Sequence, residues 1–230
     1  MPIIHDEEFG KITVRRSARA SQVRLRVAPD GTLRASLPLY APAFLVKRLI
    51  KTSRHELRDL LAQSAPTVTY EEGMRIGKSH VLSVRPTASN LVLKRRGQQI
   101  HVLLPGNKQL NDADVVRAIR DVVQQALRIE AKSYLPKRLA FLSEKLGFSY
   151  QHVRFSHASG RWGSCNSAGT ISLNIALMKL PFELIDYVII HELAHTRYMN
   201  HSDAFWQTVA VGDPDYKRHR AQLKQESPTV

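Results

Sequence analysis

The chain has 230 residues, enough to bury a sizeable core as one large domain or two small ones. Its hydrophobic content of 43% and charged content of 23% are ordinary for a globular protein, and a single cysteine excludes an internal disulfide framework. No run is both long and apolar enough to span a bilayer, and the N-terminus lacks the pattern of a signal peptide, so we expect a cytoplasmic protein without a membrane partner.

The charge is unevenly distributed along the chain. The net charge is +14, and residues 1–110 hold 19 basic and 8 acidic side chains, against 15 and 12 in residues 111–230. A basic first half is typical of a protein that binds nucleic acid or another polyanion, although a solvated basic surface explains it equally simply. The sequence carries no recognised nucleic-acid readout motif and indicates no oligomeric state.

Short strands and one helix are predicted at the start of the chain. Apolar and polar residues alternate, as in half-buried strands, over Lys11–Arg16, Val23–Ala28 and Leu33–Leu37. The second and third of these form a hairpin, which places Arg24, Arg26 and Arg34 together on its solvent face. A helical spacing of apolar residues follows from Ala43 to Ala62.

Further strands are predicted around Ser79–Val84 and Ile100–Leu104, with Leu91–Leu93 as a third candidate and Gly97 at a hairpin tip. No internal repeat is evident. A turn sequence beginning at Pro105 closes this part of the chain. We therefore expect two domains, a small basic β-rich one over residues 1–110 and a second one over residues 111–230.

The second half predicts an α+β arrangement. Residues 112–145 have a helical pattern, in which Pro136 ends one helix or kinks a long one. Strands at Val153–Ser156 and Thr170–Asn174 bracket a loop rich in small residues. A long apolar helix is then expected from Phe182 to Met199.

A metal-binding motif lies on that helix. His191 and His195 are four residues apart, so both imidazoles point the same way, about 6 Å apart along the axis, and can reach one Zn²⁺. Glu192 lies beside them, where a carboxylate can take a proton from a zinc-bound water. The alternative explanation is two core histidines with Glu192 on the surface.

A catalytic zinc also needs a third protein ligand. His201 can supply it only if the helix stops first, and Asn200 is one of the few non-glycine residues that tolerate the left-handed conformation of such a stop. Ser202 then suits the N-cap of a new helix, Asp203–Val211. The weaker candidates for the third ligand are Asp203, Asp213, Asp215 and His219, the last of which lies in a basic run and is expected to be solvated.

Two further residues near the motif are candidates for catalysis and binding. Tyr198 lies seven residues after His191, on nearly the same helical face, so its hydroxyl can stabilise the oxyanion of a tetrahedral intermediate, or the ring can simply pack. Arg161 can anchor a carboxylate or phosphate of the substrate, or form a structural ion pair.

These residues resemble a known family. RWGSC (161–165), the strand that ends at Asn174, HELAH (191–195) and NHSDAFW (200–206) are similar to the YgjP-like metallopeptidases, relatives of the SprT-like and WLM zinc proteases in the gluzincin group. The resemblance implies a helical zincin domain with a small sheet, along whose edge strand a protein or peptide substrate lies. It also implies roles for particular residues, namely zinc ligation by His191, His195 and His201, general base catalysis by Glu192, and a cleft bordered by Arg161, Trp162 and Gly163.

Three functions remain open at this point. The first is zinc-dependent hydrolysis of peptide bonds. The second is metal-dependent hydrolysis of the phosphoanhydride of a nucleoside triphosphate, for which the basic half is suitable although no G-x-x-x-x-G-K-[ST] loop is present. The third is a nucleic-acid-associated protein of SprT-like type, in which the metal site is structural or belongs to a protease directed to chromosome-bound targets.

Overall fold

The computed structural model describes residues 2–18, 20–28, 32–63 and 69–229 of a mixed α+β protein, the fold class that the sequence predicts. The chain divides into two compact units, Met1–Thr69 and Tyr70–Val230. This division falls at residue 69, whereas the sequence placed a boundary near residue 110. Among the described residues, no helix is long and apolar enough to cross a membrane.

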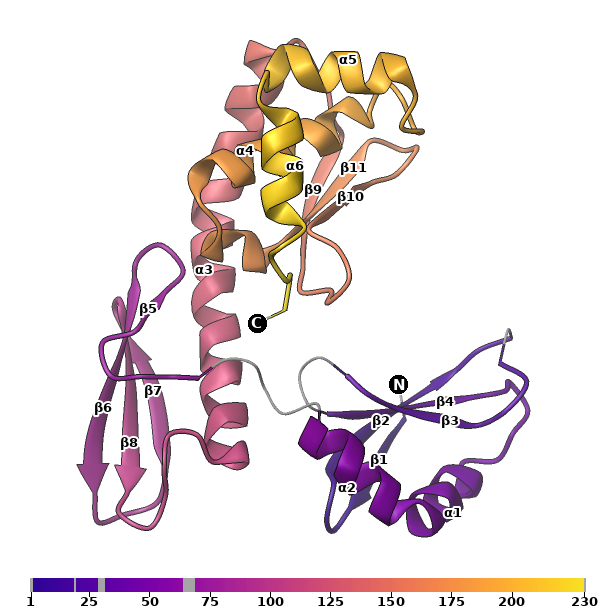
Figure 1. Ribbon diagram of the computed structural model, residues 1–230, viewed down its shortest axis with the longest axis vertical. Coiled ribbons are helices and arrows are strands. Elements are labelled where there is room, and N and C mark those ends of the chain that lie inside the picture. Colours follow the sequence, from indigo (N-terminus) through magenta and orange to yellow (C-terminus); the bar gives the residue numbers. More distant parts are fainter. Residues whose placement is uncertain (1, 19, 29–31, 64–68, 230) are drawn as a thin grey trace. The chain divides into compact units, whose positions relative to one another are not determined.

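The first unit is a four-stranded sheet with two helices against one face (Figure 1). Its elements are β1 (Ile3–Asp6), β2 (Gly10–Arg16), β3 (Arg24–Val27), β4 (Leu33–Leu37), α1 (Phe44–Thr52) and α2 (Arg54–Gln63). The strands lie in the order β1-β2-β4-β3, with β2 parallel to β4 and the other pairs antiparallel. Alternate strand residues point toward the helices, and the buried core includes Ile12, Leu33, Leu37, Val46 and Ile50.

Most of the sequence predictions for this unit are confirmed. The predicted hairpin is the antiparallel pair β3–β4, and its register pairs Arg26 with Arg34 and Arg24 with Ser36, so the three arginines share one exposed face. The single helix predicted over 43–62 is wrong, because the chain forms two helices that break at Ser53, whose N–H donates to the Leu49 carbonyl.

The second unit begins with another four-stranded sheet. Its strands are β5 (Arg75–Ile76), β6 (His80–Thr87), β7 (Val92–Arg96) and β8 (Gln99–Pro105), in the order β5-β6-β8-β7. The three predicted strands correspond to β6, β7 and β8. Gly97 has a φ of 57° at the tip of the β7–β8 hairpin, a conformation that favours glycine.

The two four-stranded sheets share one topology, which corrects the prediction that the chain has no repeat. In each sheet the first two strands are antiparallel, the second is parallel to the fourth, and the third is antiparallel to the fourth. Strands β1–β4 therefore correspond to β5–β8. The repeat is difficult to see in the sequence because many residue combinations satisfy the same alternation of buried and exposed positions.

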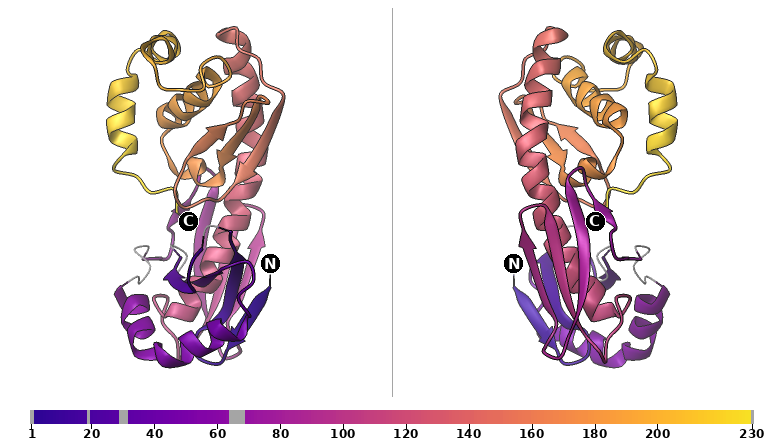
Figure 2. Two further views of the ribbon diagram at one scale, coloured as in Figure 1. Left: turned by 90° about the vertical axis from the view of Figure 1, so that its right-hand side faces the viewer. Right: turned by 90° about the vertical axis from the view of Figure 1, so that its left-hand side faces the viewer.

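A single long helix, α3 (Ala113–Lys145), connects the parts of the second unit. Its 33 residues make it about 50 Å long, and Pro136 lies inside it without ending it. The sheet β5–β8 packs against its first part, and several elements within residues 152–194 pack along the rest (Figures 1 and 2). Because both groups of elements share this helix, residues 70–110 belong to the second unit.

The remaining elements surround the predicted motif. They are β9 (His152–Ser156), β10 (Gly163–Cys165), β11 (Thr170–Asn174), the 3₁₀ helix η1 (Ile175–Lys179), α4 (Phe182–Ala194), α5 (Asp203–Gly212) and α6 (Tyr216–Leu223). The three strands form a sheet in the order β10-β11-β9, and α4 lies between α3 and α6 (Figure 2).

Candidate metal centre

Two of the predicted ligands lie at the end of α4. From Leu184 to Ile190 the helix is buried apart from the half-buried Asp186, and it places His191, itself half-buried, in its last turn and His195 at its C-cap. The ring centroids of these two histidines are 4.9 Å apart. The helix ends at Ala194 and not at Met199 as predicted, and in the turn that follows the Thr196 hydroxyl donates to the Leu193 carbonyl at 2.7 Å.

The turn also orients His195. Its Nδ1 donates a hydrogen bond to the Tyr198 carbonyl at 2.9 Å. This bond fixes the proton on Nδ1 and leaves the Nε2 lone pair for a cation, as is usual for metal-binding histidines. Tyr198 therefore contacts the site through its carbonyl. Because the helix has already ended, the predicted placement of Tyr198 on the same helical face as His191 is wrong, and its side chain is 38% exposed.

The chain folds back after the turn and brings His201 to the other two histidines. The Nε2 atoms of His201 and His191 are 3.2 Å apart, and the ligand atoms of His191, His195 and His201 all lie within 4.8 Å of one another. The predicted convergence is therefore present. The predicted stop at Asn200 is not, because no non-glycine residue in the described ranges has a positive φ.

Aromatic side chains of α5 hold the three imidazoles together. The helix begins at Asp203 as predicted, although Ser202 at its N-cap makes no side-chain capping bond. Phe205 is fully buried, and its ring centroid lies 4.6 to 4.9 Å from those of all three histidines. These contacts form a close-packed apolar floor under the site.

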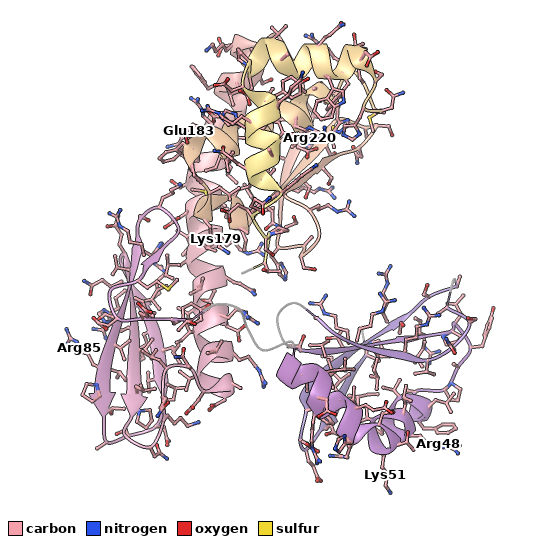
Figure 3. All side chains as sticks on the ribbon, in the orientation of Figure 1. Arg48, Lys51, Arg85, Lys179, Glu183 and Arg220 are labelled. Atoms are coloured by element: carbon pink, nitrogen blue, oxygen red, sulfur yellow. The ribbon has the colours of Figure 1, made fainter. Side chains whose placement is uncertain are left out.

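His201 is also part of an aromatic stack. Its ring stacks on Trp206 at 5.6 Å, and Trp206 in turn stacks on Tyr216 of α6 at 5.4 Å. The guanidinium of Arg220, labelled on α6 in Figure 3, lies 4.6 Å from the centroid of the Trp206 ring. The position of His201 therefore depends on α5 and α6 together.

The environment of His191 and His201 disfavours their charged forms. Burial, followed by the neighbouring His195 and His201, lowers the pKa of His191 to about 3, and burial also lowers the pKa of His201. The buried Nδ1 of His191 has no hydrogen-bond partner among the described residues. The Nε2 atoms of His191 and His201 can share a hydrogen bond at 3.2 Å, and the three ligand atoms also lie close enough together to bind one cation, so the residues fit a metal ion.

Glu192 lies inside the protein, which excludes the alternative in which it is a surface residue. It is 5% exposed, burial raises its pKa to about 8, and Arg161 partly opposes this rise. Its Oε2 atom is buried and has no hydrogen-bond partner in the described part of the chain. Such an unpaired buried carboxyl oxygen is costly and is typical of a functional site.

Strand β10 passes directly beside this carboxyl group. A β-carbon placed on Gly163 would lie 2.5 Å from Glu192 Oε1, so only glycine permits this approach. Gly163 is thus next to Glu192, and Arg161 is near enough to affect its pKa. No contact of the Trp162 side chain with the site is seen among the described residues.

Asn174 organises the loop that carries Arg161 and Trp162. It is fully buried, and its Nδ2 donates to the carbonyls of Ala158 at 2.7 Å and Arg161 at 2.9 Å. Its backbone N–H donates to the Trp162 carbonyl at 2.8 Å. Sequence reasoning missed this role; the signal was a polar residue where the alternation of Ile171 and Leu173 continues no further.

The weaker candidates for the third ligand are engaged elsewhere or lie outside the cluster. His219, expected to be solvated, is 7% exposed, and its Nδ1 donates to Asp213 at 2.7 Å. Asp215 pairs with Arg218 at 2.9 Å. Within the described residues, the three-histidine cluster is the only group that meets the geometry of a metal site.

One family model matches most of the chain. The model of the YgjP-like metallopeptidase domain matches residues 21–226. No curated protein matches the chain. Among solved structures, the crystal structure of the metallopeptidase zymogen of Pyrococcus abyssi abylysin is 27% identical, with a TM-score of 0.37, and the match covers 39% of this chain and 91% of that chain.

Proposed function

The chain belongs to the YgjP-like metallopeptidase family, and we propose that it hydrolyses peptide bonds of protein or peptide substrates with a Zn²⁺ ion held by His191, His195 and His201. The observation that carries this proposal is the convergence of three imidazoles beside a buried glutamate.

The donor set favours zinc. Imidazole nitrogens suit Zn²⁺, whereas Mg²⁺ and Ca²⁺ prefer oxygen ligands. Three protein ligands are also the usual number for catalytic zinc. When bound, the ion supplies Lewis acidity, which polarises a carbonyl oxygen and lowers the pKa of water.

Glu192 is the proposed general base. Its buried, unpartnered Oε2 would accept the proton of the attacking water and then deliver it to the nitrogen of the leaving amine. The raised pKa of about 8 supports this role, because a carboxyl group with a pKa near neutrality both accepts and releases a proton readily.

The small sheet offers a place for the substrate backbone. In the described structure β10 pairs with β11 alone, so its other edge has backbone groups that an extended peptide can pair with. Because Gly163 of β10 touches Glu192, a peptide along this edge would pass the base. Arg161 would then anchor a carboxylate of the substrate.

Replacement of Glu192 tests the proposal. Glu192→Gln should retain zinc, measured by mass spectrometry, and lose peptide hydrolysis by at least about 100-fold. Glu183→Gln is the matched control, since Glu183 is exposed at the other end of the same helix, where Figure 3 labels it. Hydrolysis of a nucleoside triphosphate by a chain inert toward peptides would replace this proposal with phosphoanhydride hydrolysis.

A further inference from the structure

The first sheet has one face covered by helices and one open face that is strongly basic. The register places Arg15, Ser36 and Arg24 in one row across β2, β4 and β3. A second row contains Thr13, Arg34 and Arg26, and all four arginines are exposed. Neighbouring strands lie about 4.8 Å apart and alternate residues about 6.7 Å apart, so these side chains form a dense positive patch.

Two acidic residues of this unit, Asp6 and Glu8, are engaged away from the open face. Asp6 and Glu8 pair with Arg54 and Arg58 of α2, which packs on the other face of the sheet. Described strand positions on the open face carry no carboxylate: they are Ile3, His5, Thr13, Arg15, Arg24, Arg26, Arg34 and Ser36. The described strand positions of the open face therefore carry positive charge that no carboxylate among them neutralises.

The second sheet repeats this arrangement. On its face opposite the buried residues Leu82, Ile100 and Val102, the register places exposed Arg85 and Lys94. The exposed Arg75 and Arg96 lie on the same face, again without an acidic strand residue among those described. Figure 3 shows Arg85 on the side of the sheet away from α3. A basic open face thus occurs in both copies of the repeated topology.

The composition of these faces indicates the kind of partner. Rows of arginine and lysine without carboxylates match the phosphates of a nucleic acid, and double-stranded DNA carries a negative charge about every 1.7 Å along its axis. Proteins that hold single strands add aromatic side chains on which bases stack. The described strand positions on both open faces contain no Phe, Tyr or Trp. This absence favours contact with the backbone of a duplex.

We propose that the open basic faces of the sheets β1–β4 and β5–β8 bind the phosphate backbone of double-stranded DNA, independently of base sequence. This activity is separate from peptide hydrolysis and does not depend on the histidine cluster. It would give the peptidase access to substrates that are bound to DNA.

Charge-matched variants of the full chain test the proposal. The first variant replaces Arg15, Arg24 and Arg26 with Gln, and the second replaces Arg85, Lys94 and Arg96 with Gln. The control replaces Lys47, Arg48 and Lys51, which are exposed on α1, where Figure 3 labels two of them. Each variant removes the same charge, so only position differs. Binding to a fluorescein-labelled DNA duplex of about 20 base pairs is followed by fluorescence anisotropy from about 50 to 200 mM KCl.

The proposal predicts that the wild-type chain binds the duplex and that affinity falls steeply with salt. Each face variant should bind the duplex at least about tenfold more weakly at low salt. The slope of log affinity against log salt should become less steep by about 0.9 for each phosphate contact removed. The control should change by less than about twofold. Unchanged melting temperature and zinc content would show that the variants fold.

Several outcomes would overturn the proposal. They are no binding by the wild type, equal losses in the face variants and the control, and retention of binding by both face variants. A loss confined to one variant restricts the surface to that face. The face variants are also tested with single-stranded DNA, an RNA duplex and phosphatidylserine vesicles. If they lose affinity for one of these but bind the DNA duplex as the wild type does, the faces belong to that other partner.

Discussion

Gly163 lies so close to Glu192 that a β-carbon at position 163 would stand 2.5 Å from the Oε1 atom of the carboxyl group. A helix residue and a strand residue thus fix each other's position, and the approach depends on the absence of a side chain. The first prediction follows from this contact.

Gly163→Ala should displace Glu192 or strand β10 and lower kcat/KM for a peptide substrate by at least about tenfold, because small misplacements of a catalytic group are costly. Zinc content should stay unchanged, since the ligands come from other elements. Gly160→Ala is the control, because a β-carbon there meets nothing within 4 Å. Equal activities of the two variants would show that the contact does not position Glu192.

The third ligand gives the second prediction. His201→Ala should weaken zinc binding strongly, because two imidazoles of one helix remain where three converged. Competition with a chromophoric chelator measures the affinity. His157→Ala, a substitution of an exposed histidine in the loop after β9, should leave it unchanged. Wild-type affinity in His201→Ala would place the third ligand elsewhere.

The aromatic stack gives the third prediction. Trp206 lies between His201 and Tyr216, so Trp206→Leu should free the His201 ring and weaken zinc binding about 10- to 100-fold, as loss of an orienting residue typically does. Trp206→Phe keeps an aromatic face and should recover part of the affinity. If both variants melt as the wild type does and bind zinc equally tightly, the stack has no role in positioning the ligand.

Glu130 of α3 gives a prediction about pH. Burial opposes its ionisation, but hydrogen bonds from Lys78 N–H, His80 Nδ1 and Ser79 outweigh burial and lower its pKa. A folded-state pKa below the unfolded one stabilises the protein above the unfolded pKa of about 4.3, and this stability is lost as the pH falls through the folded value.

Urea unfolding between pH 7 and pH 3 therefore checks Glu130. The free energy of unfolding should fall below about pH 4.3 in the wild type, and fall less in Glu130→Gln, which has no charge to lose. Glu144→Gln on the exposed side of the same helix is the control and should follow the wild type. If the free energy of unfolding falls with pH equally in Glu130→Gln and in the wild type, ionisation of Glu130 does not contribute to the stability of the folded state.

Strand faces and the spacing of residues on one helix could be predicted from the sequence, because local patterns determine them. The alternation in β2, β3 and β4 was sufficient to place the arginines on one face, and the spacing of His191 and His195 was sufficient to indicate a shared ligand. These features depend on the geometry of one strand or one helix, which a short window of sequence specifies.

Features that depend on particular side-chain contacts or strand pairings could not be predicted. Strand β10 has three residues, too few for a period, and exists because it pairs with β11. The turn after α4 is accompanied by hydrogen bonds of Thr196 and His195 to backbone carbonyls, which no sequence period indicates. His219 is buried because Asp213 lies beside it, although its sequence neighbours are charged.

The central claim is that three imidazoles converge on one zinc ion, and a crystal grown with zinc tests it most directly. Anomalous diffraction at the zinc edge should show a single strong peak about 2.0–2.1 Å from a nitrogen of each of His191, His195 and His201. The absence of a peak among these three rings, or rings that point away from one another, would contradict the account.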